Sequence, residues 1–363
     1  MTDRVRGTAR HLIFTGTYEP QDRPSIYTYI FDAARERLEP GPVYTGIAHP
    51  SFLAVDARSQ RLFAVSETVT EGHVVSFHYH PQTGELSEIS SQPTGGTEPC
   101  HLSVDETGRW LLAVNYRTGS VCLYPIDSNG AIQPMRQQIV HDGQSVHVER
   151  QESSHPHAIF PIPGTPLWLV PDLGADRLYV YELDTDMGQL SRKSITNTAP
   201  GTGPRHVAFH PASPWMYVVN ELASSVTRYA FDPLTGELTS FETTPAVPES
   251  YRGDNTTADI HIEDDGSFLF VSNRGHDSIA EYRVEEDGTL SPIGWTPSGG
   301  QVPRNFAILP GTPYLLVANQ ASNNLVLMRQ SDDGKLKESG IDRTVPSPVC
   351  IQAIRMDTAI APQ

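Results

Sequence analysis

The stretch GPRHVAFHPASPWMYVVNE, residues 203–221, contains the unit that decides the fold. Its apolar run from Val207 to Phe209 predicts a short strand, and a turn rich in Pro and Ser follows. The run from Trp215 to Val219 predicts a second strand, which ends at Asn220. A third strand and an outer strand are expected on either side of the Asp/Pro/Gly turn at residues 232–236. Short strands joined by such turns are typical of an antiparallel sheet.

This unit recurs along the whole chain. The residues that precede each first strand are spaced by 45 to 56 positions, at Phe52, His101, His157, His206, Asp259, Asn305 and Cys350. Repeats of this length that consist only of strands indicate a β-propeller. The unit at Cys350 lacks its later strands, which residues 12–18 and 25–31 can supply. We therefore predict an all-β, seven-bladed β-propeller with four-stranded antiparallel blades, in which N- and C-terminal strands share one blade and close the ring.

Length and composition fit one closed domain over residues 1–363, with residues 1–10 as a flexible N-terminal extension. The chain has 28 Gly and 30 Pro for its many turns and a formal net charge of −17. Nucleic acid and anionic membranes would be repelled by this charge, so neither is an expected partner. An anionic small substrate would need a local basic site.

The cysteines and the N-terminus predict the compartment. Cys100, Cys122 and Cys350 are an odd count without Cys-x-x-Cys spacing, so free thiols in a reducing compartment are expected. Residues 1–10 are polar and lack an apolar stretch of signal-peptide length, and no segment approaches the ~20 apolar residues of a membrane span. We expect a cytoplasmic protein, and a monomer because a closed propeller needs no partner.

Polar residues gather at two repeat positions that should form rings at one mouth of the central channel. The first-strand starts contribute His101, His157, His206, Asp259 and Asn305, with Arg205 and Arg304 one residue earlier. The second-strand ends contribute Glu67 after Ser66, and Glu221, Arg274 and Gln320 each after an Asn, where other blades also have Asn or Asp. The recurring Asn and Asp are expected to cap turns by bonding backbone N–H groups. The residue after them varies between blades, so Glu221 and Arg274 are the better functional candidates.

No common metal or phosphate motif is present. The chain has no phosphate-cradling Gly loop, no Gly-x-Ser-x-Gly elbow and no His-Glu-x-x-His helix. His155 and His157 flank a proline and have no companion ligand cluster. We expect neither a metal nor another cofactor.

With these residues in view, the chain resembles the lactonase family of seven-bladed propellers, which includes propeller-type 6-phosphogluconolactonases and the related carboxymuconate cyclases. The segments that carry the resemblance span nearly the whole chain and include EPCHLSVD (98–105), PDLG (171–174), GPRHVAFHP (203–211), VNEL (219–222), ADIH (258–261), VSNRGH (271–276), PRNFA (303–307) and SPVC (347–350). The resemblance implies a propeller enzyme that acts on a small, anionic lactone.

The resemblance also implies a set of catalytic residues. A His, a Glu and two Arg are proposed for the cyclase branch, and they fall on His157, Glu221, Arg205 and Arg274 here. The loop around Arg150 and the PRNF segment look like the bacterial lactonase branch, which favours hydrolysis over cyclisation. The remaining candidates for substrate binding are His101, His206, Asp259, Arg304, Asn305, Glu67, Arg150 and Gln320.

The expected reaction is hydrolysis of a sugar lactone, with 6-phosphogluconolactone of the pentose phosphate pathway as the preferred substrate. His157 or Glu221 would act as general base, Arg274 or Arg205 would stabilise the oxyanion, and Arg304 with Arg205 would hold the phosphate. Four alternatives stay open: a muconate-type cyclase, a lactonase for an unphosphorylated lactone, a non-enzymatic interaction propeller, and a metal-dependent sugar lactonase. The last would use Glu67, Asn115, Asp172 and Asn220 as oxygen ligands.

Overall fold

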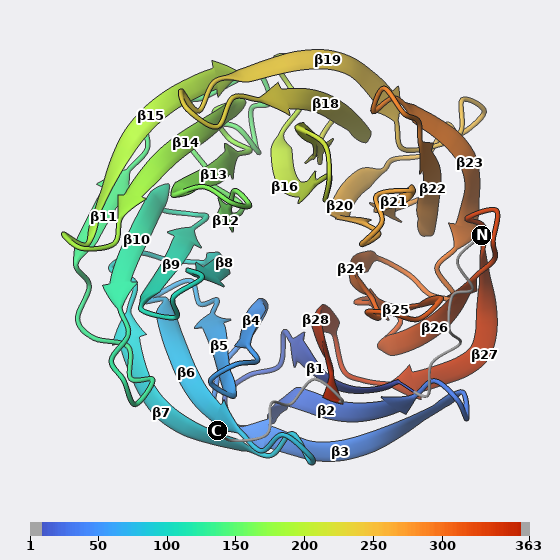
Figure 1. Cartoon of the computed structure of the whole chain (residues 1–363), viewed down its shortest axis with the longest axis horizontal. Helices are drawn as coiled ribbons and strands as arrows, with labels where there is room; N and C mark the ends of the chain where they lie inside the picture. The colour runs from blue at the N-terminus through green and yellow to red at the C-terminus, as the bar shows by residue number, and fades with distance from the viewer. Residues whose placement is uncertain (1–8, 357–363) are drawn as a thin grey trace.

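The computed structural model describes residues 9–356, in which every regular element is a β-strand. The 28 strands form seven four-stranded antiparallel sheets arranged as a ring around a central axis (Figure 1). The predicted seven-bladed propeller is therefore confirmed. Residues 1–8 of the predicted flexible extension lie outside the described residues. Within the described range, no helix has the length and apolar character that crossing a membrane requires.

Each blade runs from an innermost strand at the channel to an outer strand at the rim. The strands of each blade are listed from the inside out. Blade 1 consists of β28 (Pro348–Arg355), β1 (Arg10–Thr17), β2 (Pro24–Asp32) and β3 (Arg37–Thr45), and blade 2 consists of β4 (Leu53–Asp56), β5 (Arg61–Ser66), β6 (His73–Tyr79) and β7 (Leu86–Pro93). Blade 3 consists of β8 (Pro99–Val104), β9 (Trp110–Asn115), β10 (Ser120–Pro125) and β11 (Gln137–Val140), and blade 4 consists of β12 (Phe160–Pro161), β13 (Leu167–Asp172), β14 (Arg177–Asp184) and β15 (Gln189–Asn197).

Blades 5 to 7 follow the same order. Blade 5 consists of β16 (Pro204–Phe209), β17 (Trp215–Asn220), β18 (Ser225–Phe231) and β19 (Leu238–Pro245). Blade 6 consists of β20 (Thr256–Ile262), β21 (Phe268–Arg274), β22 (Ser278–Val284) and β23 (Leu290–Pro297). Blade 7 consists of β24 (Pro303–Ile308), β25 (Tyr314–Asn319), β26 (Asn324–Gln330) and β27 (Leu336–Thr344).

The ring closes in blade 1, as the sequence predicts. β28 pairs antiparallel with β1, from His11 opposite Arg355 to Thr17 opposite Pro348. The C-terminal strand thus becomes the innermost strand of a blade whose other strands come from the N-terminus. Closure removes the free sheet edges that an open array of blades would expose.

The hydrophobic core is divided into seven clusters, one between each pair of neighbouring blades. Between blades 1 and 2, for example, Phe14 packs with Leu62 and Phe77, and each of these side chains is fully buried. Each such side chain stabilises the fold by roughly 2 kcal/mol through burial. The three cysteines are also buried, and all are free thiols as predicted. The cytoplasmic location inferred from them stays a prediction.

Candidate active site

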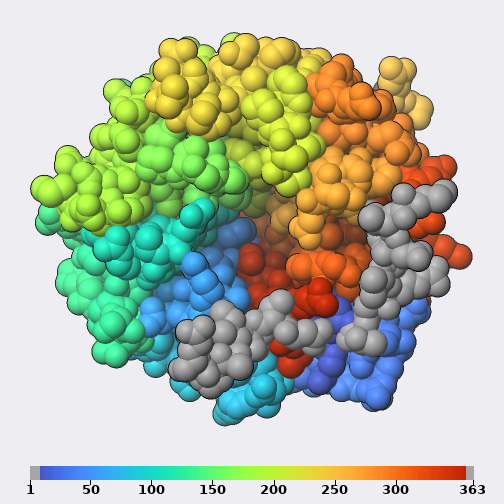
Figure 2. All heavy atoms as spheres, viewed as in Figure 1, coloured from blue at the N-terminus to red at the C-terminus, as the bar shows by residue number. Residues whose placement is uncertain are grey.

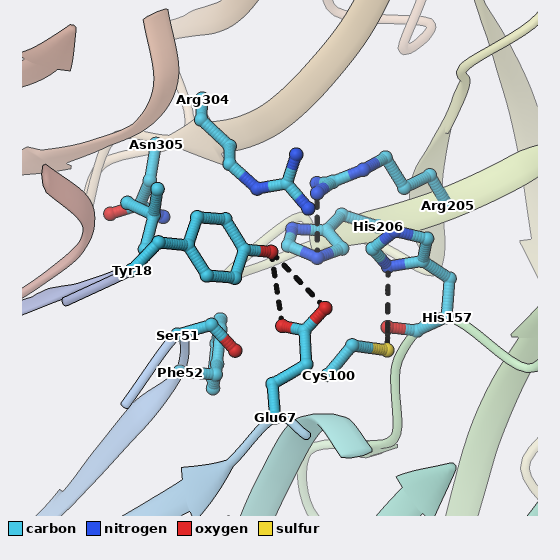
Figure 3. Close-up of a pocket in the computed structure, with 11 residues that line it drawn as sticks. Tyr18, Ser51, Phe52, Glu67, Cys100, His157, Arg205, His206, Arg304 and Asn305 are labelled. Carbon is cyan, nitrogen blue, oxygen red and sulfur yellow. Dashed lines mark hydrogen bonds between the residues drawn. The ribbon is translucent and has the colours of Figure 1, made fainter. Parts of the chain in front are cut away.

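Two adjoining cavities occupy the central channel, which Figure 2 shows as a hollow in the middle of the ring. The larger, which we call the mouth cavity, has a volume of about 290 Å³ and is lined by Glu67, Glu98, Cys100, Tyr116, Arg150, His157, Glu221, Thr256, Arg274 and Arg304. The smaller inner pocket (Figure 3) measures about 10 Å³ and is lined by Tyr18, Ser51, Phe52, Glu67, Cys100, His157, Arg205, His206, Arg304, Asn305 and Val349. The mouth cavity suits a small metabolite, and the inner pocket is about the size of one water site.

A bulge in the innermost strands points side chains into these cavities. The register between β16 and β17 shifts between Pro204 and His206, which leaves Arg205 unpaired. The same shift isolates Cys100 in β8 and Arg304 in β24. A bulge re-aims the side chain of the extra residue, and all three of these residues line the inner pocket.

The structure corrects the predicted alignment of His157. The repeat comparison places His157 level with His206, but the strand pairing places it one residue earlier. Pro156 bridges the last residue of β13, just as Pro204 pairs with the last residue of β17. His157 follows that proline and therefore occupies the position of Arg205. The sequence is misleading here because β12 has only two residues, so the apolar run gives no exact register.

Glu221 is a buried carboxylate surrounded by three arginines. Arg205 Nε donates to its Oε2 at 2.9 Å, and Arg150 Nη2 donates to its Oε1 at 2.6 Å. Arg274 Nη2 lies 3.0 Å from Oε2, and Nε2 of His157 lies 3.9 Å from the same oxygen. Since Glu221 is only 2% exposed and Arg205 only 3%, water screens these charges poorly.

The arginines determine the charge state of Glu221. Burial alone would raise the pKa of Glu221, but Arg274, Arg205 and Arg150 together outweigh it and hold this pKa well below its usual range. Burial lowers the pKa of Arg274 to about 10, although Glu221 opposes the shift, so this guanidinium remains charged at neutral pH. An ionised carboxylate with so low a pKa is a weak proton acceptor. Its geometry suits it to hold the guanidinium groups in place.

His157 is a second candidate for the proton acceptor and lies next to Glu221. Burial and the positive charges of Arg205, His206 and Arg304 place the pKa of His157 well below its ordinary value. The imidazole is therefore neutral at pH 7 and can accept a proton. The Cys100 thiol lies 3.3 Å from the carbonyl oxygen of His157 and fixes the backbone at this position (Figure 3).

Arg304 differs from the other arginines of the site. Among residues 9–356 it forms no hydrogen bond or ion pair, and its guanidinium lies 5.2 Å from the centre of the Tyr18 ring. The hydroxyl of Tyr18 donates to Oε2 of Glu67 at 3.0 Å. Figure 3 shows the guanidinium ends of Arg304 and Arg205 converging on one side of the inner pocket. Like charges that converge in this way favour an anionic ligand between or beside them.

A buried polar network lies beneath the arginines. Oδ1 of Asp259 accepts a hydrogen bond from Nδ1 of His206 at 2.8 Å, and Oδ2 lies 2.9 Å from Nε2 of His261. Asn305 also donates to Asp259. Arg205 Nη1 donates to Nε2 of His206 at 3.2 Å, which fixes the proton of His206 on Nδ1. Asp259 thus orients His206, and His206 orients Arg205.

Comparison with known proteins places the chain in a family. A family model described as a seven-bladed β-propeller lactonase matches residues 12–353. The chain belongs to this lactonase family. It is 31% identical over 345 residues to the 6-phosphogluconolactonase of Bacillus subtilis (strain 168), covering 94% of this chain and 98% of the relative. A 6-phosphogluconolactonase of Formosa agariphila is 33% identical over 341 residues, covering 90% and 94% of the two chains.

A solved structure shows the same family likeness. The periplasmic gluconolactonase of Pseudomonas aeruginosa superposes with a TM-score of 0.89 at 30% identity, over 95% of this chain and 99% of that chain. Of these relatives, some are thus named for a phosphorylated gluconolactone and one for the unphosphorylated form.

Nine of the twelve predicted site residues line one of the two cavities. They are His157, Glu221, Arg274, Arg205, His206, Arg304, Asn305, Glu67 and Arg150. His101 and Asp259 lie in the layer beneath, where His101 stacks on Phe52 with ring centroids 3.9 Å apart. Gln320 follows β25 and lines neither cavity. The role of these three in substrate binding stays a prediction.

The sequence prediction missed several residues that line the cavities. Tyr18 and Tyr116 follow β1 and β9, which is the position that Glu221 takes after β17. The rule that selected Glu221 would have found both tyrosines if applied to every blade. Glu98 and Thr256 precede the bulged positions and carry no repeat signal.

The Asn and Asp residues that end the second strands are structural. Asp172 accepts hydrogen bonds from the backbone N–H groups of His155 and Ala175, at 2.8 and 3.0 Å, as predicted for a turn cap. The asparagines instead donate, as Asn220 does to Ser225 Oγ at 3.1 Å. Neither Asp172, Asn220 nor Asn115 lines a cavity, so the donors proposed for a metal site are not brought together there. In the part of the chain that the structure describes, no group of three His, Cys, Asp or Glu side chains is placed to hold a metal ion.

Proposed function

We propose that the protein hydrolyses a sugar lactone that carries an anionic group, most simply 6-phosphogluconolactone to 6-phosphogluconate. Membership of the lactonase family and the names of its relatives support lactone hydrolysis. The observation that carries the choice of an anionic lactone is Arg304, a cation that lines both cavities and forms no hydrogen bond or ion pair among residues 9–356. The remaining three arginines are already engaged by Glu221.

His157 is the proposed general base. The lactone lies in the mouth cavity with its carbonyl carbon over the inner pocket, which has room for about one water molecule. His157 lines both cavities and is neutral at pH 7. It removes a proton from the water while the water oxygen forms a bond to the carbonyl carbon.

Arg274 is the proposed partner of the developing oxyanion. It lines the mouth cavity, and its Nε is a buried donor without an acceptor among residues 9–356. A buried donor that lacks a partner is costly, and a developing oxyanion nearby would supply one. The tetrahedral intermediate then collapses, the ring C–O bond breaks, and the protonated His157 returns its proton to the departing ring oxygen. The products are one hydroxyl and one carboxylic acid, which releases its remaining proton to solvent at neutral pH, with no change of oxidation state.

Arg304 is the proposed anion subsite. A guanidinium fork matches two oxygens of a phosphate, and such a bond is stronger than one between neutral groups. Arg205, which the sequence pairs with Arg304 for this role, is already bonded to Glu221 and to the carbonyl of Ala258 at 2.6 Å. Arg205 therefore serves to position Glu221, and Arg304 meets the phosphate.

Cyclisation of a muconate is less favoured by the same charges. Four arginines and three carboxylates line the two cavities, which leaves one net positive charge when all are ionised. A substrate with several carboxylates would bring more negative charge than this site compensates. One phosphate group carries about 1.5 to 2 negative charges at pH 7 and therefore exceeds the net charge of the site by less than three carboxylates would.

The test measures initial rates of 6-phosphogluconolactone and glucono-δ-lactone hydrolysis, corrected for spontaneous hydrolysis, with and without EDTA. We expect kcat/KM for the phosphorylated lactone to be at least tenfold higher and the rate to be unchanged by EDTA. A preference for the unphosphorylated lactone would overturn the proposed substrate, while lactone hydrolysis as the reaction would stand. A lack of acceleration for both would overturn the proposal, and loss of rate in EDTA would overturn the metal-free mechanism.

A further inference from the structure

The mouth cavity has an acidic side as well as a basic one. Glu67 follows β5 and Glu98 precedes β8, so both come from neighbouring blades 2 and 3. Arg274 ends β21 in blade 6, which lies across the ring from those two blades in Figure 1. We call Glu67 and Glu98 the acidic wall. The mechanism proposed above uses neither of these side chains.

The acidic wall has unused hydrogen-bond acceptors. The Glu67 carboxylate receives one hydroxyl, that of Tyr18, at 3.0 and 3.2 Å from its two oxygens. The Glu98 side chain makes no hydrogen bond or ion pair within residues 9–356, although it is only partly exposed. An ionised carboxylate offers about four acceptor sites, so both residues can accept several further donors. Sugar hydroxyl groups are neutral donors of the right kind.

We propose that the acidic wall recognises hydroxyl groups of the substrate and makes Glu98 a specificity-determining residue. This inference rests on the proposed function, since it assigns the polyhydroxylated part of the same lactone to the side of the cavity opposite Arg274. Bonds from hydroxyls to a charged acceptor are worth more than neutral ones and strengthen in a partly enclosed site. The same two carboxylates repel a second anionic group. The wall thus selects a polyol with one anionic group and rejects a dicarboxylate.

The backbone of Glu98 makes this residue a good position to test. Its φ of 53° lies in the left-handed region that favours glycine, and blade 5 has Gly203 with φ of 62° at the equivalent place before the bulge proline. Substitution Glu98→Gly therefore relieves backbone strain, and Glu98→Gln preserves the shape of the side chain. Both variants are expected to fold.

The experiment measures binding of gluconate and hexanoate by calorimetry, because this pair differs in hydroxyl groups and not in charge. Wild-type protein should bind gluconate at least tenfold more tightly than hexanoate. Glu98→Gln and Glu98→Gly should weaken gluconate binding about tenfold and leave hexanoate binding unchanged. Glu71→Gln removes the same charge from an exposed position that lines neither cavity, and it should keep the wild-type ratio.

The outcomes separate this inference from the proposed function. An unchanged gluconate-to-hexanoate ratio in both Glu98 variants would overturn the acidic wall, as would a wild-type protein that binds gluconate no better than hexanoate. Parallel rate measurements with 6-phosphogluconolactone and glucono-δ-lactone report the hydrolysis itself. If the wild type hydrolyses neither lactone but shows the Glu98-dependent ratio, the proposed function fails and the recognition of hydroxyl groups stands.

Discussion

Arg205 and Glu221 form a buried ion pair within one blade, with 2.9 Å between Nε and Oε2. Arg205 occupies the bulge of β16, and Glu221 directly follows β17, so the pairing of these two strands sets their distance. Arg150 and Arg274 reach Glu221 from a loop and from blade 6. The pair is therefore the fixed point around which the other charges of the mouth assemble.

Substitution Glu221→Gln should affect both stability and activity. It leaves the buried Arg205 and Arg274 without their carboxylate, and breaking a buried pair costs about 3–5 kcal/mol of unfolding free energy. We expect kcat/KM for the lactone to fall by roughly a hundredfold or more because the arginines lose their positions. Urea unfolding and initial rates measure the two effects. Arg150→Gln is the milder comparison, since its side chain is 37% exposed and solvent screens its contact with Glu221 in part. Wild-type stability and turnover in Glu221→Gln would contradict the assignment.

The pH dependence of kcat/KM should identify the base. Protonation of His157 removes its ability to accept a proton, so activity falls as pH drops through the pKa of this residue. Because burial and nearby arginines lower that pKa, the acid limb should lie below about pH 6.5, the ordinary value for histidine. Arg304 contributes to the shift, so Arg304→Gln should move the limb to higher pH. An acid limb at the same pH in wild type and Arg304→Gln would argue against His157 as the base.

Arg304→Gln should also change substrate preference. Loss of the guanidinium removes a charge-assisted, two-pronged contact, and we expect kcat/KM for 6-phosphogluconolactone to fall by roughly a hundredfold at pH 7. The value for glucono-δ-lactone should stay within about threefold. Arg329→Gln is the matched control, because Arg329 is 45% exposed and pairs with Glu36 away from the cavities. Equal losses for both lactones in Arg304→Gln would exclude a phosphate subsite at this residue.

Repeat spacing was sufficient to predict the fold. The repeats are spaced by 45 to 56 residues, and the strand at Cys350 lacks partners near it in the sequence. These two features predict seven blades, one of them shared by the two ends of the chain, because the strand pattern depends on local sequence. An open ring would leave a free sheet edge, so closure of the ring was expected, and β28 does pair with β1. Local pattern also selected Glu221 and Arg274 as candidates, because the residue after the recurring Asn or Asp differs from blade to blade.

The arrangement of the site could be predicted only in part. The register of His157 depends on a bulge next to a two-residue strand, and no apolar pattern of that length fixes a register. Arg304 and Arg205 look alike in the sequence. Only the convergence of four blades and a loop decides which of these arginines lacks a carboxylate. The structure separates them, because Glu221 follows the strand that pairs with β16 and binds Arg205.

The network beneath the arginines should make stability depend on pH. Burial would lower the pKa of His261, but Asp259 outweighs it and raises this pKa above its ordinary value. A raised pKa contributes stability that is fully present below about pH 6.5 and is lost as pH rises through the higher folded-state value. Asp259 has its pKa held well below the usual range, since His261 and His206 outweigh burial, so its contribution is lost only in acid. The pair therefore stabilises the fold most between about pH 4 and 6.5.

Thermal unfolding between pH 5 and 9 tests this dependence. Wild-type Tm should fall as pH rises above 6.5, and His261→Gln should flatten this fall because it removes the titrating partner of Asp259. His78→Gln on β6 controls for loss of an exposed histidine that has no contact with the network. Parallel Tm profiles for wild type and His261→Gln would show that the Asp259–His261 pair adds no pH-dependent stability. Since His261 lines neither cavity, lactone hydrolysis at pH 6 should be nearly unchanged in this variant, which separates stabilisation of the fold from the chemistry above it.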